Sequence, residues 1–123
     1  LEFIARLLMK VESIIKAMEM EQAKKGVFTD EADLLMVVTT HLPRLDECCM
    51  IRQEAIHRIG IPDIVCCYKG RFVAIELKDD EGVQSQLQKK WQRDIEAAKG
   101  IYILADSVYP ICDTLMQIAQ GKI

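Results

Sequence analysis

Hydrophobic residues recur at two different spacings along this chain of 123 residues. From residue 2 to about 25 they return every three or four positions, which is typical of one face of an amphipathic helix, and Gly26 ends the pattern. This apolar face consists of Ile4, Leu7, Leu8, Val11, Ile15 and Met18. In contrast, residues 62–68 and 71–78 favour β-strands, with polar and apolar positions separated onto opposite faces.

The remaining segments complete a mixed α/β chain. Further helices are expected at about residues 30–41, 86–98 and 109–119, and further strands near residues 48–53 and 101–105. Half of the residues are hydrophobic, which is enough to bury one core in a chain of this length. We therefore expect a single domain over residues 1–123, with an extra N-terminal helix in residues 1–26 and the main α/β core in residues 27–123.

The segment Tyr68-Lys69-Gly70-Arg71 predicts a hairpin turn between the two central strands. A two-residue loop at Lys69 and Gly70 would place Asp63 directly opposite Glu76, with Cβ atoms about 5 Å apart. At an effective dielectric constant near 20, two unit charges at that distance repel by roughly 3 kcal/mol. A divalent cation would offset this repulsion.

The two faces of the predicted hairpin differ in polarity. One face is wholly apolar and suited to burial under a helix; it consists of Ile64, Cys66, Val73, Ile75 and Leu77. The other face gathers charged groups at one end, and its members are Asp63, Val65, Cys67, Phe72, Ala74, Glu76 and Lys78. Lys78 follows Glu76 by two residues and so shares its face, which indicates a site at the edge of the core.

Three sequence runs in this order resemble the VRR-NUC branch of the PD-(D/E)XK nucleases, of the stand-alone phage type. They are GIPDIV at residues 60–65, KGRFVAIELK at residues 69–78, and SQLQ with a tryptophan at residues 85–91. The resemblance covers about residues 48–108. It implies a restriction-endonuclease-like αβββαβ core, with a mixed sheet flanked by helices, and metal-dependent hydrolysis of DNA phosphodiester bonds.

The resemblance also implies roles for individual residues. Asp63 and Glu76 would bind the metal together with the backbone carbonyl of Leu77, and such oxygen ligands suit Mg²⁺ or Mn²⁺. Lys78 would orient the attacking water and stabilise developing negative charge, and Gln88 would support the site as a further polar group. Taken outside the motif, Lys78 is explained better by a plain ion pair with Glu76 or Asp63, and within the full motif the catalytic role is the better explanation.

Two residues of the predicted helix at 86–98 have structural explanations as well. Ser85 and Gln88 have the spacing of a capping box, in which Gln88 reaches back to the helix start. Both roles of Gln88 are compatible. Trp91 shares one helical face with Leu87, Ile95 and Ala98, and we expect it to be a core residue.

Many members of the family carry a further acidic ligand on a helix about thirty residues before the PD aspartate. Glu31 is the best candidate for that metal ligand. Its alternative role is a favourable interaction with the N-terminus of its own helix. Glu12, Glu19 and Glu54 are the other candidates if the helices lie elsewhere.

The five cysteines include two adjacent pairs, Cys48-Cys49 and Cys66-Cys67, but no CxxC motif that would bind zinc. They are expected to be free thiols in a reducing compartment, which indicates a cytoplasmic location. The resemblance to phage-type proteins implies that this is the cytoplasm of a phage or bacterial host cell. Charged residues interrupt the N-terminal apolar stretch, so neither a signal peptide nor a membrane span is expected.

The formal net charge of −3 is unusual for a protein that binds DNA. Basic residues of the central region could nevertheless surround the carboxylates and contact phosphates. The candidates are Arg52, Arg58, Lys69, Lys89 and Lys90, with Arg93 nearby. The same residues would also fit an ordinary solvated surface.

We therefore predict a metal-dependent DNA endonuclease, with branched DNA such as a Holliday junction as substrate and a homodimer as the active form. A nuclease acting on nicks, flaps or duplex DNA is one alternative, and a catalytically idle nucleic-acid-binding or scaffold domain is another. The helix at residues 2–25 would either contribute to the dimer, through residues such as Leu7 and Val11, or cover its own sheet.

Overall fold

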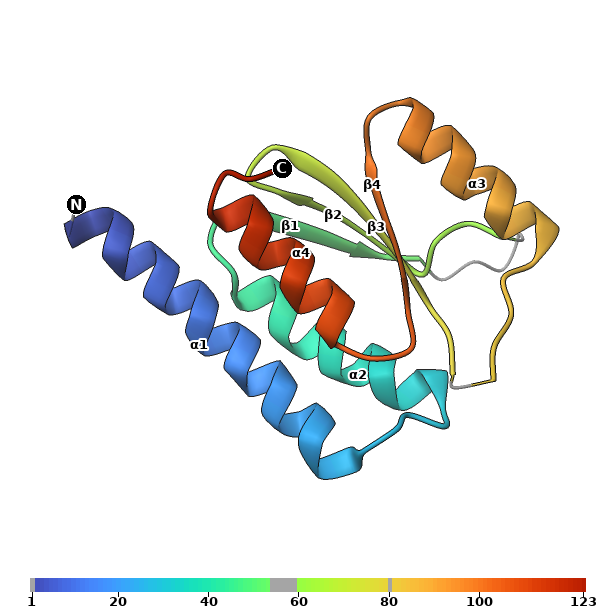
Figure 1. Ribbon diagram of the computed structural model, residues 1–123, viewed down its shortest axis with the longest axis horizontal. Helices are drawn as coiled ribbons and strands as arrows, with labels where there is room; N and C mark the ends of the chain where they lie inside the picture. Colours follow the sequence, from blue (N-terminus) through green and yellow to red (C-terminus); the bar gives the residue numbers. More distant parts are fainter. Residues whose placement is uncertain (1, 54–59, 80) are drawn as a thin grey trace.

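The computed structural model describes residues 2–53, 60–79 and 81–123 (Figure 1). This part of the chain forms a mixed α/β structure with four α-helices, a short 3₁₀ helix and a four-stranded sheet. The helices are α1 (Glu2–Lys25), α2 (Glu31–His41), α3 (Gln86–Ala97) and α4 (Tyr109–Ala119), and the 3₁₀ helix η1 covers Leu42–Arg44. The strands are β1 (Cys48–Arg52), β2 (Ile64–Tyr68), β3 (Arg71–Leu77) and β4 (Ile101–Ala105).

The strands follow one another across the sheet in the order β1-β2-β3-β4. The first three are antiparallel, and β4 is parallel to β3 because the chain crosses over through α3. Lys69 and Gly70 form the β2–β3 turn with positive φ angles of 51° and 80°, as a type I′ hairpin requires. This turn places Ile64 opposite Ile75, which confirms the predicted register.

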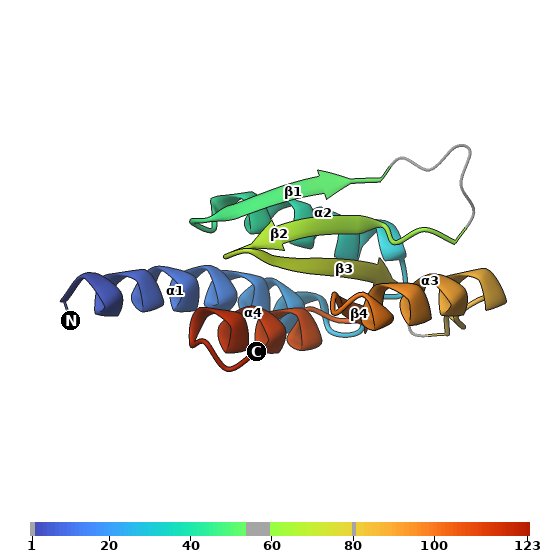
Figure 2. The same ribbon diagram turned by 90° about the horizontal axis from the view of Figure 1, so that it is seen from above.

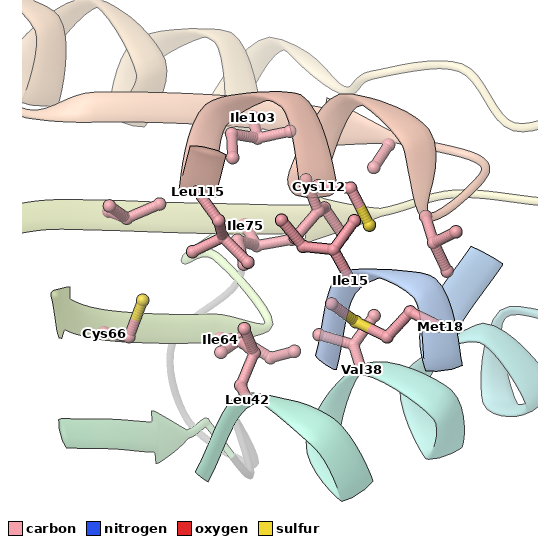
Figure 3. Packing of buried hydrophobic residues seen from close by; sticks show 14 of the residues in the cluster. Ile15, Met18, Val38, Leu42, Ile64, Cys66, Ile75, Ile103, Cys112 and Leu115 are labelled. Carbon is pink, nitrogen blue, oxygen red and sulfur yellow. The ribbon is translucent and has the colours of Figure 1, made fainter. Parts of the chain in front are cut away.

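One face of the sheet, the inner face, carries the apolar hairpin residues and is buried. Ile64, Val73 and Ile75 have no exposed surface, and Cys66 and Leu77 are almost as fully covered. Residues of α2 and α4 such as Val38 and Leu115 complete the core above this face (Figure 3). The prediction that the apolar face is buried is therefore confirmed.

The long helix α1 packs mainly against α2 and α4 of its own chain (Figures 1 and 2). Ile15 and Met18 lie between these two helices (Figure 3), and Val11 is also buried. The buried Gln22 accepts a 2.9 Å hydrogen bond from the Val108 N–H at the start of α4. Val11 is thus buried within the chain, whereas Ile4, near the start of the same helix face, is exposed.

Helix α3 stands apart from the other helices, next to β4 (Figures 1 and 2). It packs against the opposite face of the sheet, the outer face, where Ile95 approaches Phe72 and Gly100. None of its residues is fully buried, and Trp91 is only half-buried. The expectation of a core tryptophan is therefore wrong, because α3 covers only part of the outer face. Within residues 2–53, 60–79 and 81–123, no helix is both long and apolar enough to cross a membrane.

Candidate functional site

The outer face of the sheet carries Asp63 and Glu76 side by side at the end of the β2–β3 hairpin. Asp63 immediately precedes β2, and its Oδ2 accepts a 2.8 Å hydrogen bond from the Leu77 N–H of β3. Its carbonyl oxygen accepts a further 2.8 Å hydrogen bond from the Gln53 N–H at the end of β1. Three neighbouring strands therefore fix the position of the Asp63 carboxylate relative to Glu76.

Glu76 is a buried carboxylate, with 3% of its surface exposed. Its Oε1 accepts a 2.6 Å hydrogen bond from Nε2 of Gln88, while its Oε2 is buried and has no hydrogen-bond partner in the described part of the chain. Burial, and then the charge of Asp63, raise the pKa of Glu76 to about 8, whereas the charge of Lys78 lowers it. Burial also raises the pKa of Asp63, against the opposing effects of the Leu77 N–H and of Lys78.

This arrangement is costly for a purely structural strand. A buried polar atom without a partner costs about 1–3 kcal/mol, and a charged one costs more. The second carboxylate beside Glu76 adds to that cost. A proton or a cation bound at Oε2 of Glu76 would offset this cost.

Lys78 follows the end of β3 and keeps a partly exposed side chain. Its N–H donates a 2.9 Å hydrogen bond to the Ala105 carbonyl of β4, which fixes its backbone. Among the described residues it forms no ion pair with Asp63 or Glu76, although its charge lowers the pKa of both. A Cβ atom on Gly82 would lie 2.9 Å from Lys78 Cδ, so the absence of a side chain there lets the loop fold against the lysine.

Gln88 has both of the roles expected from the sequence. Its Oε1 accepts a 2.8 Å hydrogen bond from the Ser85 N–H, and its own N–H donates a 3.2 Å bond to Ser85 Oγ, which completes the capping box. The other end of the same amide donates to Glu76. The start of α3 is therefore connected directly to the buried carboxylate.

Two further polar groups near the site were missed in the sequence. Gln53 lies opposite Asp63 through the backbone hydrogen bond described above. Tyr102 of β4 accepts a 3.2 Å hydrogen bond from Gln84 Nε2, and the charges of Glu76 and Asp63 are among the causes that raise its pKa, after burial. Gln88 and Gln92, four residues apart on α3, were a signal for this polar side of the helix, and Gln84 lies just before its N-cap Ser85.

The acidic residues considered as a further metal ligand do not complete a carboxylate cluster. Glu31 begins α2, where Asp30 is the N-cap, and its charge contributes weakly to the raised pKa of Glu76. However, no group of three or more His, Cys, Asp or Glu side chains in the described ranges is arranged to hold a metal ion. Glu12 and Glu19 lie on α1, and Glu54 lies outside the described residues.

Asp63 and Glu76 nevertheless fit a hard divalent cation. Mg²⁺ is commonly bound through one or two protein carboxylates, and water or substrate phosphate supplies the other oxygens. The buried Oε2 of Glu76, which has no described partner, is an oxygen of the required kind next to a second carboxylate. A third acidic side chain is therefore not needed for such a site.

The basic residues are distributed differently from the prediction. Lys69 lies in the turn at the opposite end of the hairpin, where it pairs with Glu47 at 3.4 Å, so it does not surround the carboxylates. Arg52 is exposed at the end of β1, and Lys89 is exposed on α3. Lys90 pairs with Asp94 at 2.9 Å and lies 5.3 Å from the centre of the Trp91 ring. Arg58 lies outside the described residues.

All five cysteines are free, as predicted. Cys48 and Cys66 are hydrogen-bonded neighbours on the inner face, and this contact raises the pKa of Cys66 and lowers that of Cys48. Cys49 and Cys67 lie opposite each other on the outer face. None of them lies in a described cluster that could bind zinc.

Comparison with known proteins gives no match to a family model, to a curated protein or to a solved structure. The functional assignment therefore depends on the geometry of the site and on the sequence motifs. The most informative observation is the buried Glu76 carboxylate, which lies beside Asp63 and is hydrogen-bonded to Gln88.

Proposed function

We propose that this chain is a divalent-cation-dependent DNA endonuclease of the VRR-NUC branch of the PD-(D/E)XK nucleases, with a restriction-endonuclease-like core. The element order α2-β1-β2-β3-α3-β4 supports the fold assignment. The observation that carries the function is the buried Oε2 of Glu76, which lacks a described partner and lies beside Asp63.

Each residue of the site has a defined task in this proposal. Asp63, Glu76 and the Leu77 carbonyl would hold Mg²⁺ or Mn²⁺, which when bound would polarise the scissile phosphate and help to activate the attacking water. Gln88 holds the Glu76 carboxylate in one orientation through its 2.6 Å hydrogen bond. The Leu77 N–H does the same for Asp63.

Lys78 would supply a positively charged group beside the two carboxylates. Because no described ion pair occupies it, its ammonium group can donate to a phosphate oxygen and stabilise the negative charge that develops there. Its position two residues after Glu76 keeps it on the same side of the sheet. Together these residues can bind a phosphodiester and polarise it for attack.

The alternative is a catalytically idle nucleic-acid-binding or scaffold domain. Such a domain gains nothing from two carboxylates whose pKa values are both raised by burial. The costs of that pair favour a catalytic role. Branched DNA and a homodimer belong to the proposal as the substrate and assembly that the family resemblance implies.

The decisive experiment measures cleavage of branched, flapped, nicked and linear DNA in the presence of Mg²⁺. We expect Asp63→Asn and Glu76→Gln each to lower the rate on the preferred substrate by at least about 100-fold. Lys122→Met, at the exposed C-terminal end, is the control that retains full activity. Equal cleavage by the wild type and both site variants would show that the activity comes from elsewhere, and an inactive wild type would favour the idle domain.

A further inference from the structure

The outer face of the sheet is hollowed beside α3. Two adjoining hollows, of about 490 Å³ and 290 Å³, share Phe72, Trp91 and Ile95 as walls. The larger hollow reaches Gly70 at the hairpin turn, and the smaller one reaches Pro62. We call the two together the Trp91 groove.

The Trp91 groove begins beside the candidate site. Pro62 and Gln53 line its near end, and these residues respectively precede Asp63 and hydrogen-bond to it. Phe72 shares the outer face of β3 with Glu76 and precedes it by four residues, which corresponds to about 13 Å along the strand. A nucleic-acid strand with one phosphate at Glu76 would therefore have its neighbouring nucleotides within reach of the groove.

The walls of the groove are flat and aromatic. Phe72 is 46% exposed, although it is a large apolar residue, and Trp91 is half-buried. A Cβ atom on Gly100 would lie 3.0 Å from Phe72 Cδ1 and 2.8 Å from Ile95 Cγ2, so glycine at this position allows the ring and the helix to approach. The surface thus offers exposed ring surface in a fixed position.

The charges around the groove suit a polyanion. Arg71 and Lys99 line the larger hollow, and Lys90 lies over the Trp91 ring. Asp94 is the carboxylate in the same lining, and it pairs with Lys90. This region is therefore basic in a chain whose net charge is −3.

The same charges disfavour a second copy of the chain in the groove. In a twofold contact the same surface patch lies on both subunits, so the cations of one copy would approach those of the other. The cores of protein interfaces are also depleted of charged residues. A nucleic-acid strand meets neither objection, because its bases stack on aromatic rings while its phosphates attract Lys and Arg.

We propose that the Trp91 groove binds an unpaired nucleobase of the substrate strand, which stacks on Phe72 and Trp91. The proposal rests on the nuclease function, which places a phosphate at Asp63 and Glu76, and it names the substrate class. Bases inside an uninterrupted duplex are stacked on each other and cannot enter the groove, so the preferred DNA has unpaired nucleotides next to the scissile phosphate.

Trp91 is the only tryptophan of the chain, so its fluorescence reports directly on the groove. The titration uses single-stranded oligothymidylate, a flapped duplex and a blunt duplex of the same length, in Ca²⁺ buffer, with gels to verify that the DNA stays intact. We expect quenching of Trp91 emission by the first two and little quenching by the blunt duplex.

Variants of the second ring test the stacking itself. Phe72→Ala should weaken binding of oligothymidylate by about tenfold in fluorescence anisotropy, within the range measured for loss of one stacked base. Phe72→Leu keeps an apolar side chain but no flat ring, and it should weaken binding as well. Tyr109→Ala removes an exposed aromatic residue on α4 and should leave binding unchanged. Melting curves and circular dichroism establish that each variant is folded.

The outcomes separate this proposal from the nuclease function. Equal quenching by blunt duplex, or unchanged affinity of folded Phe72→Ala and Phe72→Leu, would overturn the groove proposal even if Mg²⁺-dependent cleavage is observed. Quenching without cleavage of any substrate would support the groove as a nucleic-acid site and overturn the nuclease. Emission that changes only with protein concentration would mean that a second copy fills the groove, contrary to the proposal.

Discussion

Gln88 Nε2 donates a 2.6 Å hydrogen bond to Glu76 Oε1, and the other oxygen of that carboxylate is buried without a partner in the described part of the chain. One side chain thus holds Glu76 in place without neutralising it. Because Gln88 also belongs to the capping box of α3, its two roles can be separated by mutation.

Ser85→Ala and Gln88→Ala form a matched pair. Each removes part of the capping box and should lower the free energy of unfolding by about 1 kcal/mol. Only Gln88→Ala also releases Glu76, and we expect it to lower the cleavage rate by a further 10- to 100-fold, as for other groups that orient metal ligands. Thermal unfolding and cleavage assays measure the two effects. Equal activities of the two variants would show that Gln88 acts only as a cap.

Stability in metal-free buffer should depend on pH through Glu76. Its pKa is about 8 in the folded protein, whereas an unfolded glutamate ionises near pH 4.3, so the folded state binds more protons between these values. The free energy of unfolding should therefore be highest below the unfolded pKa, fall as the pH rises, and level off above about pH 8.

Glu76→Gln removes this titration and serves as the comparison. At pH 8 and with a chelator present, the variant should be more stable than the wild type by roughly 1–3 kcal/mol, because it lacks the buried charge. Melting temperatures of both proteins between pH 4 and 9 measure the difference. Parallel curves for the two proteins would contradict a raised pKa at Glu76.

Added Mg²⁺ should raise the melting temperature of the wild type, since a ligand that binds the folded state stabilises it. Asp63→Asn and Glu76→Gln should abolish most of this shift. Ca²⁺ should give a comparable shift without supporting cleavage, and excess EDTA should stop cleavage. Full activity in EDTA would exclude the metal mechanism.

Lys78→Met should abolish cleavage with little change in stability, because Lys78 has no described ion pair whose loss would destabilise the fold. Lys78→Arg keeps the positive charge and should restore part of the activity. Cleavage rates and urea unfolding curves test both statements. A marked loss of stability in Lys78→Met would instead indicate a structural ion pair with the carboxylates.

The assembly is tested best at the start of α1. Val11 is buried within the chain, so its change to lysine would unfold the protein and reveal nothing about a dimer. Phe3 and Ile4, which are 72% and 58% exposed, are better positions. If the predicted homodimer uses this end of the helix, Phe3→Lys with Ile4→Lys should convert it to a folded monomer in light scattering. An unchanged dimer would exclude this surface.

Much of the fold follows from local sequence patterns. The alternation around Lys69 and Gly70 gave the register of the hairpin, and helical spacing gave the approximate extent of each helix. The first strand of the hairpin begins two residues later than predicted, at Ile64, since Pro62 has no N–H to donate to a neighbouring strand. The short helix η1 was not predicted, although Pro43 suits its first turn.

The site was less accessible from the sequence because much of it depends on distant segments. Gln53 reaches Asp63 only through the pairing of β1 with β2, and Tyr102 approaches the carboxylates only because β4 returns beside β3. Trp91 was misassigned since helical spacing shows which residues share a face but not how much of the sheet that face covers. Lys69 could have been excluded, because the turn of a hairpin lies at the opposite end from Asp63.

The type I′ turn at Lys69 and Gly70 constrains how this protein can diverge. Adding or deleting one residue there would shift β3 by one position against β2 and bring Ile75 to the face where Glu76 now lies. The hydrophobic core and the acidic pair would be lost in the same event. Homologues that retain both should therefore vary the length of this loop by two residues at a time, or leave it unchanged.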